Sequence, residues 1–183
     1  MKKYIRDYAF LLSIATVIVL LDQWTKHLVE TLLPFGGSWS PWEWLEPYAR
    51  FVHWQNTGAA FGMFQNLSIV FTVLAFIVSI AILYYFPRVP RSEWLMRLAL
   101  ALQLGGAVGN LIDRLTQGTV TDFISVGSFA VFNIADACIS VGTVLLIFAV
   151  WDNERRQKKL AELNQGATHT AAEDSDAEQS TLE

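Results

Sequence analysis

Residues 67–86 read LSIVFTVLAFIVSIAILYYF and include no charged side chain. A helix of about 20 apolar residues is long enough to cross the hydrocarbon core of a bilayer. Three further stretches have a comparable length and composition, at about residues 9–28, 98–115 and 134–151. The chain of 183 residues is 53% hydrophobic and only 16% charged, which is too apolar for an ordinary soluble domain. We therefore predict an all-α polytopic membrane protein with four transmembrane helices.

The positively charged residues lie mainly on one side of these four spans. Ten of the 13 Lys and Arg residues flank the same ends of the spans: Lys2, Lys3, Arg6, Arg88, Arg91, Arg97, Arg155, Arg156, Lys158 and Lys159. Because cytoplasmic loops are enriched in Lys and Arg, both termini are predicted to lie in the cytoplasm, and the connections at 29–66 and 116–133 on the outer side. The segment 153–183 ends in an acidic stretch, 161–183, without Lys or Arg. Its composition predicts a disordered cytoplasmic tail.

The outer connection at 29–66 is rich in aromatic residues. It holds four of the seven tryptophans, and such side chains favour the headgroup region of a membrane. The run from Pro41 to Leu45 predicts a short interfacial helix, whereas residues 50–55 are β-prone. Gly58 lies in a small-residue stretch, 57–62, that would let the backbone of a substrate approach closely. Two interpretations remain open: an interfacial anchor, or a mobile β-like platform on which an extended peptide pairs with residues 50–55.

Two aspartates, Asp122 and Asp136, flank the start of the last apolar stretch. An ionised side chain there needs a partner, a water-filled cavity or a chemical role. Two carboxyl groups that meet share one proton, so that one serves as a base while the other stays an acid. A structural interpretation competes, because Asn133 has the character of an N-cap, and Asp136 at the third helical position would then only complement the helix dipole.

The third span combines small and polar residues. The stretch 105–109 is rich in glycine, which predicts a close contact between helices. Asn110 and Arg114 are four residues apart and therefore share one helical face. Asp113 and Arg114 at the end of the span are typical of an interfacial ion pair.

The remaining residues favour no metal or cofactor site. The single cysteine, Cys138, lies in an apolar span and excludes an internal disulfide. The histidines, His27, His53 and His169, are scattered, and we expect them to be interfacial or exposed rather than metal ligands. The sequence has no nucleotide-binding loop and no nucleic-acid footprint, so we predict no metal, no cofactor and no nucleic-acid partner.

Five short motifs in fixed order carry a resemblance to a known family. They are DQWTK at 22–26, NTGAAF at 56–61, GGAVGNLIDRL at 105–115, GTVTDF at 118–123 and FNIAD at 132–136. With these motifs the chain closely resembles lipoprotein signal peptidase, also called signal peptidase II, a bacterial aspartyl protease of the inner membrane.

The resemblance implies roles for individual residues. Asp122 and Asp136 would be the catalytic dyad. The site would be lined by Asn56, Asn110, Arg114 and Asn133. Two more residues would lie close to it, Asp22 and Lys26. The two aspartates are 14 positions apart, which is shorter than the spacing typical of the family. Residues 124–131 are therefore predicted to form a tight connection.

The resemblance also implies a function. Members of this family cut the signal peptide from prolipoproteins just before a cysteine that carries diacylglyceryl, without a metal or cofactor. Residues 1–152 would be such a peptidase, a monomer of the inner membrane whose site lies at the outer face and whose partners are lipid-modified prolipoproteins and membrane lipids.

Two other classes of protein fit parts of the sequence. A small proton-coupled carrier would use the same aspartates to relay protons, and a non-catalytic membrane scaffold would explain the tryptophans. Carriers usually bind their cargo near the bilayer midplane between repeated halves, and this sequence has no visible repeat.

Overall fold

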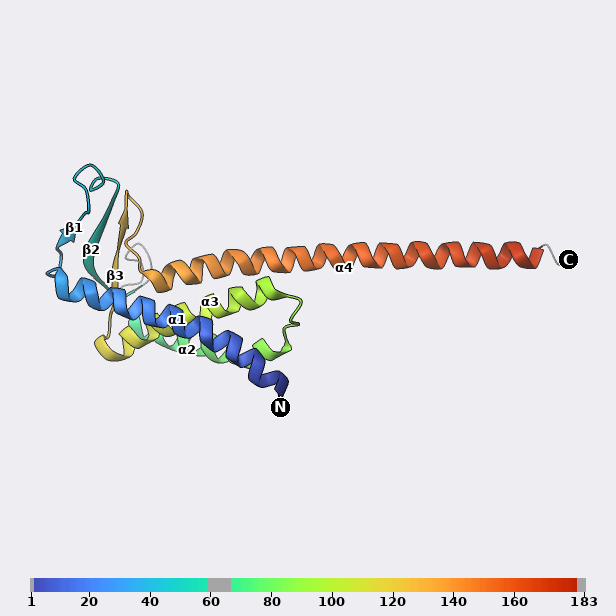
Figure 1. The fold of residues 1–183 in the computed structure, drawn as a ribbon, viewed down its shortest axis with the longest axis horizontal. Helices are drawn as coiled ribbons and strands as arrows, with labels where there is room; N and C mark the ends of the chain where they lie inside the picture. The colour runs from blue at the N-terminus through green and yellow to red at the C-terminus, as the bar shows by residue number, and fades with distance from the viewer. Residues whose placement is uncertain (1, 59–66, 181–183) are drawn as a thin grey trace. The chain divides into compact units, whose positions relative to one another are not determined.

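The computed structural model describes residues 2–58 and 67–180 (Figure 1). Its elements in chain order are α1 (Lys2–Leu32), β1 (Ser38–Trp39), β2 (Ala49–Asn56), α2 (Ser68–Tyr85), the 3-10 helix η2 (Phe86–Arg88), α3 (Trp94–Gln117), β3 (Val120–Val126) and α4 (Ile134–Ser180). Four stretches are long and apolar enough to cross a membrane: Tyr4–Leu32, Ser68–Arg88, Trp94–Gln117 and Ile134–Lys159. The four predicted transmembrane helices are thus confirmed. The chain divides into two compact units, Met1–Leu146 and Ile147–Glu183, and the packing and candidate site belong to the first.

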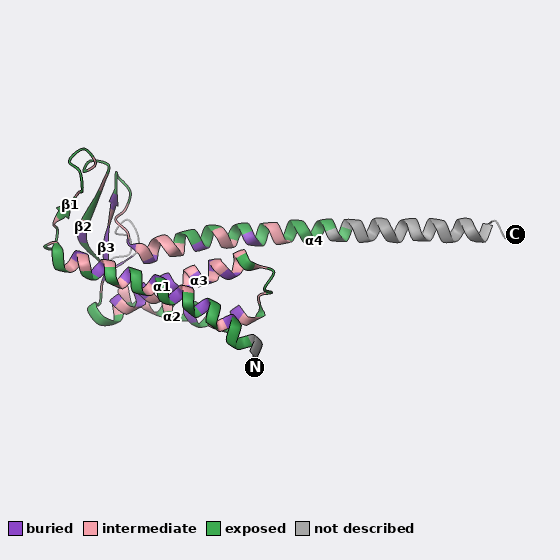
Figure 2. Cartoon of the chain, in the orientation of Figure 1, coloured by how far each residue is buried: buried purple, intermediate pink, exposed green. Residues whose placement is uncertain are grey.

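The central helix is α3. In its most apolar window 56% of the residues are buried, against 22% or less in the other three spans (Figure 2). A Cβ atom on Gly105 would lie 2.8 Å from Cβ of Ile18 in α1, and one on Gly106 would collide with the carbonyl oxygen of Ala135 in α4. The predicted close contact between helices is confirmed, and it brings α1 and α4 against α3. Close backbone approach matters here because lipid supplies no hydrophobic force between helices.

A three-stranded antiparallel sheet in the order β1-β2-β3 lies at one end of the helices (Figure 1). The predicted β platform is therefore present, with β2 as its middle strand. β2 pairs with β3 between Ala49 and Asn56, and with β1 at Phe51 and Val52. The prediction that residues 50–55 pair with an extended peptide is wrong at Phe51, because β1 and β3 already pair with it on both sides.

The connection between β3 and α4 is a tight hairpin, as predicted for residues 124–131. Gly127 has a left-handed backbone with φ of 52°, a conformation that costs glycine little. The returning chain forms a bridge between Phe132 and Ile124. This return places Asn133 beside β3, where its side chain reaches the strand.

Residues 41–48 form consecutive turns, where the sequence predicts a short interfacial helix. Hydrogen bonds there mostly join residues three apart, as between the N–H of Leu45 and the carbonyl of Trp42 at 3.0 Å. Pro47 explains the difference, because it has no N–H and disfavours helical backbone at the residue before it. Most of the small-residue stretch, residues 59–66, lies outside the described residues.

Residues 153–180 continue α4, where the composition predicts a disordered tail. This part of the chain is rich in Ala, Glu, Gln, Lys and Arg and contains no proline. These residue types have high intrinsic helix propensity, which favours a helix even without an apolar face to bury.

A buried ion pair joins α1 and α3 near their first residues. The guanidinium of Arg97 lies 2.8 Å from Oδ1 of Asp7, and Arg91 adds a second contact to the same oxygen at 2.9 Å. Both Asp7 and Arg97 are buried. The sheet follows the last residues of α1 and α3, so this pair lies at the end of the bundle remote from the sheet.

Candidate active site

Asp122 and Asp136 open onto one cavity of about 720 Å³. Asp122 belongs to β3 and is 1% exposed, whereas Asp136 lies in the first turn of α4. The cavity is lined by further predicted site residues: Asn56, Gly58, Asn110 and Arg114. The two carboxyl groups that the sequence singles out, which lie on consecutive elements, thus face one cavity together with residues of β2 and α3.

Three asparagine side chains hold the two carboxyl groups. Asn56 and Asn133 donate through Nδ2 to the two oxygens of Asp122, at 2.9 and 2.8 Å. Asn110 donates through Nδ2 to Oδ1 of Asp136 at 2.7 Å. Because each amide donates to a carboxyl oxygen, the arrangement fixes the direction in which both carboxyl groups face.

Asn133 is also the N-cap of α4, as predicted. Its Oδ1 accepts the N–H of Asp136 at 2.8 Å, and its own N–H donates to Oδ2 of Asp136 at 3.4 Å. This reciprocal pair is a capping box. The structural interpretation of Asp136 is therefore correct for one oxygen, while the other oxygen is turned to Asn110 and the cavity. The capping role of Asp136 therefore leaves one of its oxygens available for the role in a carboxyl pair that the sequence also suggests.

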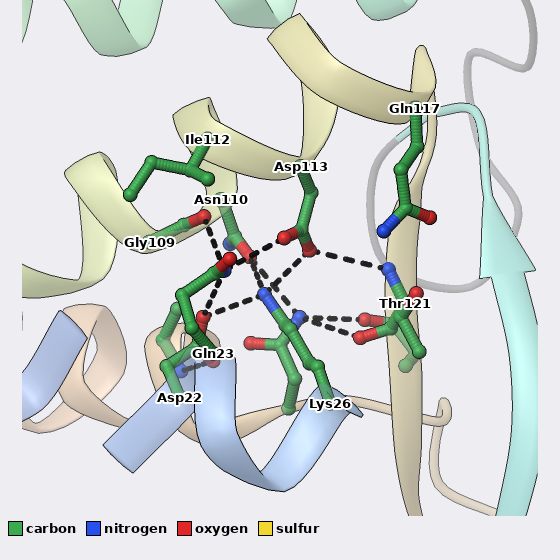
Figure 3. Close-up of polar contacts among 12 residues, drawn as sticks. Asp22, Gln23, Lys26, Gly109, Asn110, Ile112, Asp113, Gln117 and Thr121 are labelled. Carbon is green, nitrogen blue, oxygen red and sulfur yellow. Dashed lines mark hydrogen bonds and ion pairs between the residues drawn. The ribbon is translucent and has the colours of Figure 1, made fainter. Parts of the chain in front are cut away.

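Lys26 of α1 contacts Asn110, the asparagine that donates to Asp136 (Figure 3). Its ammonium group lies 2.7 Å from both Asp22 and Asp113 and donates to Oδ1 of Asn110 at 3.0 Å. Lys26 is 2% exposed, so both ion pairs are buried. An amide oxygen that accepts from Lys26 must turn its NH₂ group away, and Asn110 directs that group to Asp136. Lys26 thereby sets the orientation of the amide that contacts Asp136.

The structure also corrects the expected role of Asp113. The sequence suggested an interfacial ion pair between Asp113 and Arg114, but Asp113 is 2% exposed and pairs with Lys26. Arg114 lines the cavity instead, with its guanidinium 5.6 Å from the ring of Phe71. The missed signal is a spacing: Asp113 follows Asn110 by three residues and therefore shares its helical face.

Gln23 is a further residue that the sequence analysis did not single out. Its Nε2 donates to Oδ1 of Asp113 at 2.7 Å and to the carbonyl of Gly109 at 3.2 Å. Asp22 in turn joins α1 to α4, because its Oδ1 accepts the N–H of Ala135 at 2.9 Å. Asp22 and Lys26 thus lie close to the cavity, as predicted, and do not line it.

Burial raises the pKa of Asp122 to about 7. The main cause is the loss of water around the carboxylate, and the second is the negative charge of Asp136. Hydrogen bonds from Asn56 and Asn133 and the charge of Lys26 act in the opposite direction. Near neutral pH, Asp122 therefore exists in both protonation states.

Among the described residues, no group of three or more His, Cys, Asp or Glu side chains is arranged to hold a metal ion. His53, expected to be interfacial or exposed, is instead buried in β2, with Nδ1 2.9 Å from the carbonyl of Leu33. The ring of Phe35 packs edge-on against it. Sequence reasoning missed this burial because alternation along residues 50–55 is weak.

A family model described as signal peptidase (SPase) II matches residues 14–152. The chain belongs to the signal peptidase II family. All four membrane spans overlap the matched region, and every predicted site residue lies within it.

Individual relatives of the signal peptidase II family agree with this assignment. The chain is 44% identical to the lipoprotein signal peptidase of Mesorhizobium japonicum, over 77% of this chain and 83% of the relative. It is 38% identical to that of Halalkalibacterium halodurans, over 80% and 94% of the two chains. A solved bacterial membrane enzyme superposes with a TM-score of 0.73 at 31% identity, covering 79% of this chain and 88% of its own. The protein is thus a peptidase and a multi-pass protein of a bacterial membrane.

The raised pKa of Asp122 predicts how stability changes with pH. Between about pH 4 and 7 the folded chain keeps a proton on Asp122 that the unfolded chain releases, so rising pH favours the unfolded state. One such group changes the free energy of unfolding by at most about 1.4 kcal/mol per pH unit. We expect the Tm of the wild type in detergent to fall between pH 4.5 and 7 relative to that of Asp122→Asn. Parallel Tm curves for the two proteins would contradict the raised pKa.

Proposed function

We propose that this peptidase cuts the signal peptide from diacylglyceryl-modified prolipoproteins, just before the modified cysteine, with Asp122 and Asp136 as an aspartic dyad. The observation that carries the proposal is that a buried carboxyl group, Asp122, and a half-buried one, Asp136, both held by asparagine amides, open onto one cavity. The lipoprotein signal peptidases to which the chain is similar support the substrate class.

The chemistry follows from a single proton shared by the pair. The pKa of Asp122 is raised to about 7, so we assign the shared proton to Asp122 and the role of base to Asp136. Asp136 takes a proton from water as the water oxygen attacks the scissile carbonyl carbon, and Asp122 donates its proton to the carbonyl oxygen. As the resulting diol collapses, one of its hydroxyl protons returns to Asp122, Asp136 gives its proton to the leaving nitrogen, and the C–N bond breaks. Acid–base help of this kind supplies about 10² to 10⁴ in rate.

The cavity offers separate places for peptide and lipid. Beyond the carboxyl groups, apolar side chains of α2, α3 and α4 line it: Leu74, Val78, Ala107 and Ile139. Such a surface suits acyl chains that stay within the bilayer. Arg114 lines the same cavity and is placed to bind a carbonyl group of an extended peptide, whereas Asn56 and Gly58 bond to each other and Asn56 holds Asp122.

The charge distribution supports a site at the outer face of the inner membrane. Lys and Arg residues concentrate at the ends of the spans remote from the sheet, which would place both termini in the cytoplasm. The aromatic segment 29–58 would then lie in the outer headgroup layer. We expect the enzyme to be a monomer. The proton-coupled carrier and the membrane scaffold gain no support from the relatives, which are peptidases.

Replacement of either aspartate tests the dyad. Asp122→Asn and Asp136→Asn should each lower the initial rate of cleavage of a lipidated prolipoprotein by at least about 100-fold, because an amide cannot shuttle the proton. Asp152→Asn, which alters an exposed carboxyl group paired with Arg156, is the matched control and should cleave at the wild-type rate. If either dyad variant remained folded and kept more than a tenth of the activity, the assignment would be wrong.

Comparison of two buried cations separates positioning from stability. Lys26→Met removes the buried cation that pairs with Asp22 and Asp113, and Arg97→Met removes the buried one of the two cations that pair with Asp7. Both should lower the free energy of unfolding, by up to about 3–5 kcal/mol. Only Lys26 orients Asn110, so only Lys26→Met should lower kcat by more than about tenfold when both proteins are assayed below their Tm. Equal losses of kcat in the two variants would show that Lys26 acts through stability alone.

A further inference from the structure

Thr121, the residue immediately before Asp122, is fully buried and uses all of its polar groups. Its hydroxyl donates to Oε1 of Glu30 in α1 at 2.5 Å. Its N–H donates to Oδ2 of Asp113 in α3 at 3.4 Å, and its carbonyl accepts Nδ2 of Asn133 at 3.4 Å. One residue of β3 is therefore tied to α1, to α3 and to the N-cap of α4.

The contact with Glu30 is the strongest of the three by its chemistry. A hydroxyl that donates to a carboxylate makes a short, charge-assisted bond, about twice as strong as a bond between neutral groups. Glu30 is half-buried, and the same oxygen accepts Nε2 of Gln117 at the end of α3 at 3.3 Å. The carboxylate of Glu30 thus joins α1 to both α3 and β3.

Thr121 and Asp122 are neighbours on β3 and pair with Gln55 and Trp54 of β2. Successive side chains of a strand point to opposite faces, so the face that Thr121 presents to Glu30 determines the face that Asp122 presents to the cavity. A rotation or slip of the strand would move both together. The pairing between β2 and β3 shifts register between Phe51 and Trp54, next to the pair formed by Trp54 and Asp122. An interaction that fixes the side chain of Thr121 against α1 therefore also fixes the face that Asp122 presents.

We infer that Thr121 and Glu30 are positioning residues for Asp122. Their hydrogen bond fixes the rotation of β3 against α1, so that Asp122 remains within reach of Asn56, Asn133 and the cavity. This role rests on the proposed function, in which Asp122 is the general acid. Neither residue lines the cavity, so neither contacts the substrate.

The test removes the hydroxyl without changing the shape of the side chain. Thr121→Val should lower kcat for a lipidated prolipoprotein about 5- to 20-fold and leave KM within twofold, because small misplacement of a reacting group affects turnover more than binding. Thr121→Ser keeps the hydroxyl and should recover most of the kcat. Thr116→Val is the matched control, since its hydroxyl bonds only to carbonyl groups of its own helix.

A double-mutant cycle identifies Glu30 as the partner. Glu30→Leu should lower kcat as Thr121→Val does, and the double variant should be no slower than the slower single variant. Additive losses would overturn the proposed pairing. A Thr121→Val enzyme with wild-type kcat would overturn the positioning role, and so would failure of Thr121→Ser to recover activity. Asp122→Asn in the same assay separates the two claims. An active Asp122→Asn enzyme would refute the dyad. An inactive Asp122→Asn enzyme beside a fully active Thr121→Val enzyme would refute only the inference about Thr121.

Discussion

The rest of this structure depends on the two buried ion pairs that the ammonium group of Lys26 forms with Asp22 and Asp113. This ammonium group lies between Asp22 and Asp113 and so joins α1 to α3 through three buried side chains. From Asp113 the network reaches the backbone of β3, and from Asn110 it reaches Asp136 in α4. Buried ion pairs of this kind contribute little net stability compared with apolar packing, but breaking one is costly. The arrangement therefore favours a single geometry of helices and strand over its alternatives.

That geometry allows two carboxyl groups to face one apolar cavity. Burial alone would neutralise Asp122, and the negative charge of Asp136 adds to this tendency, while amide donors and the charge of Lys26 oppose it. The balance leaves the pKa of Asp122 at about 7, close to the pH at which a general acid works best. Burial and the neighbouring carboxylate thus explain how Asp122 can keep a proton near neutral pH.

The sequence predicts the features that follow from local composition. Four apolar stretches gave the helices, the glycines at 105–109 gave the close packing against α3, and Asn133 was recognisable as an N-cap. The fate of residues 41–48 could not be predicted as well, because a single proline, Pro47, decides between turns and a helix. The α-helical course of residues 153–180 was missed because net charge and helix propensity point in opposite directions there.

The candidate site was only partly predictable. Motifs sufficed to assign roles to Asp122, Asp136 and the asparagines. Gln23 and Thr121 lie in the same motifs and Glu30 outside them, but the contribution of all three depends on contacts between residues about 90 positions apart. Such contacts depend on how α1 lies against β3, which no local pattern encodes. Asp113 shows the same limit, since its partner is a lysine of another helix rather than the neighbouring arginine.

The pH dependence of kcat/KM for a lipidated prolipoprotein tests the central claim, that one proton shared by Asp122 and Asp136 drives cleavage. The account predicts a bell-shaped profile whose alkaline limb falls with an apparent pKa near 7 as Asp122 loses its proton. A rate that keeps rising through pH 9 would require Asp122 to act while ionised, and would contradict the account.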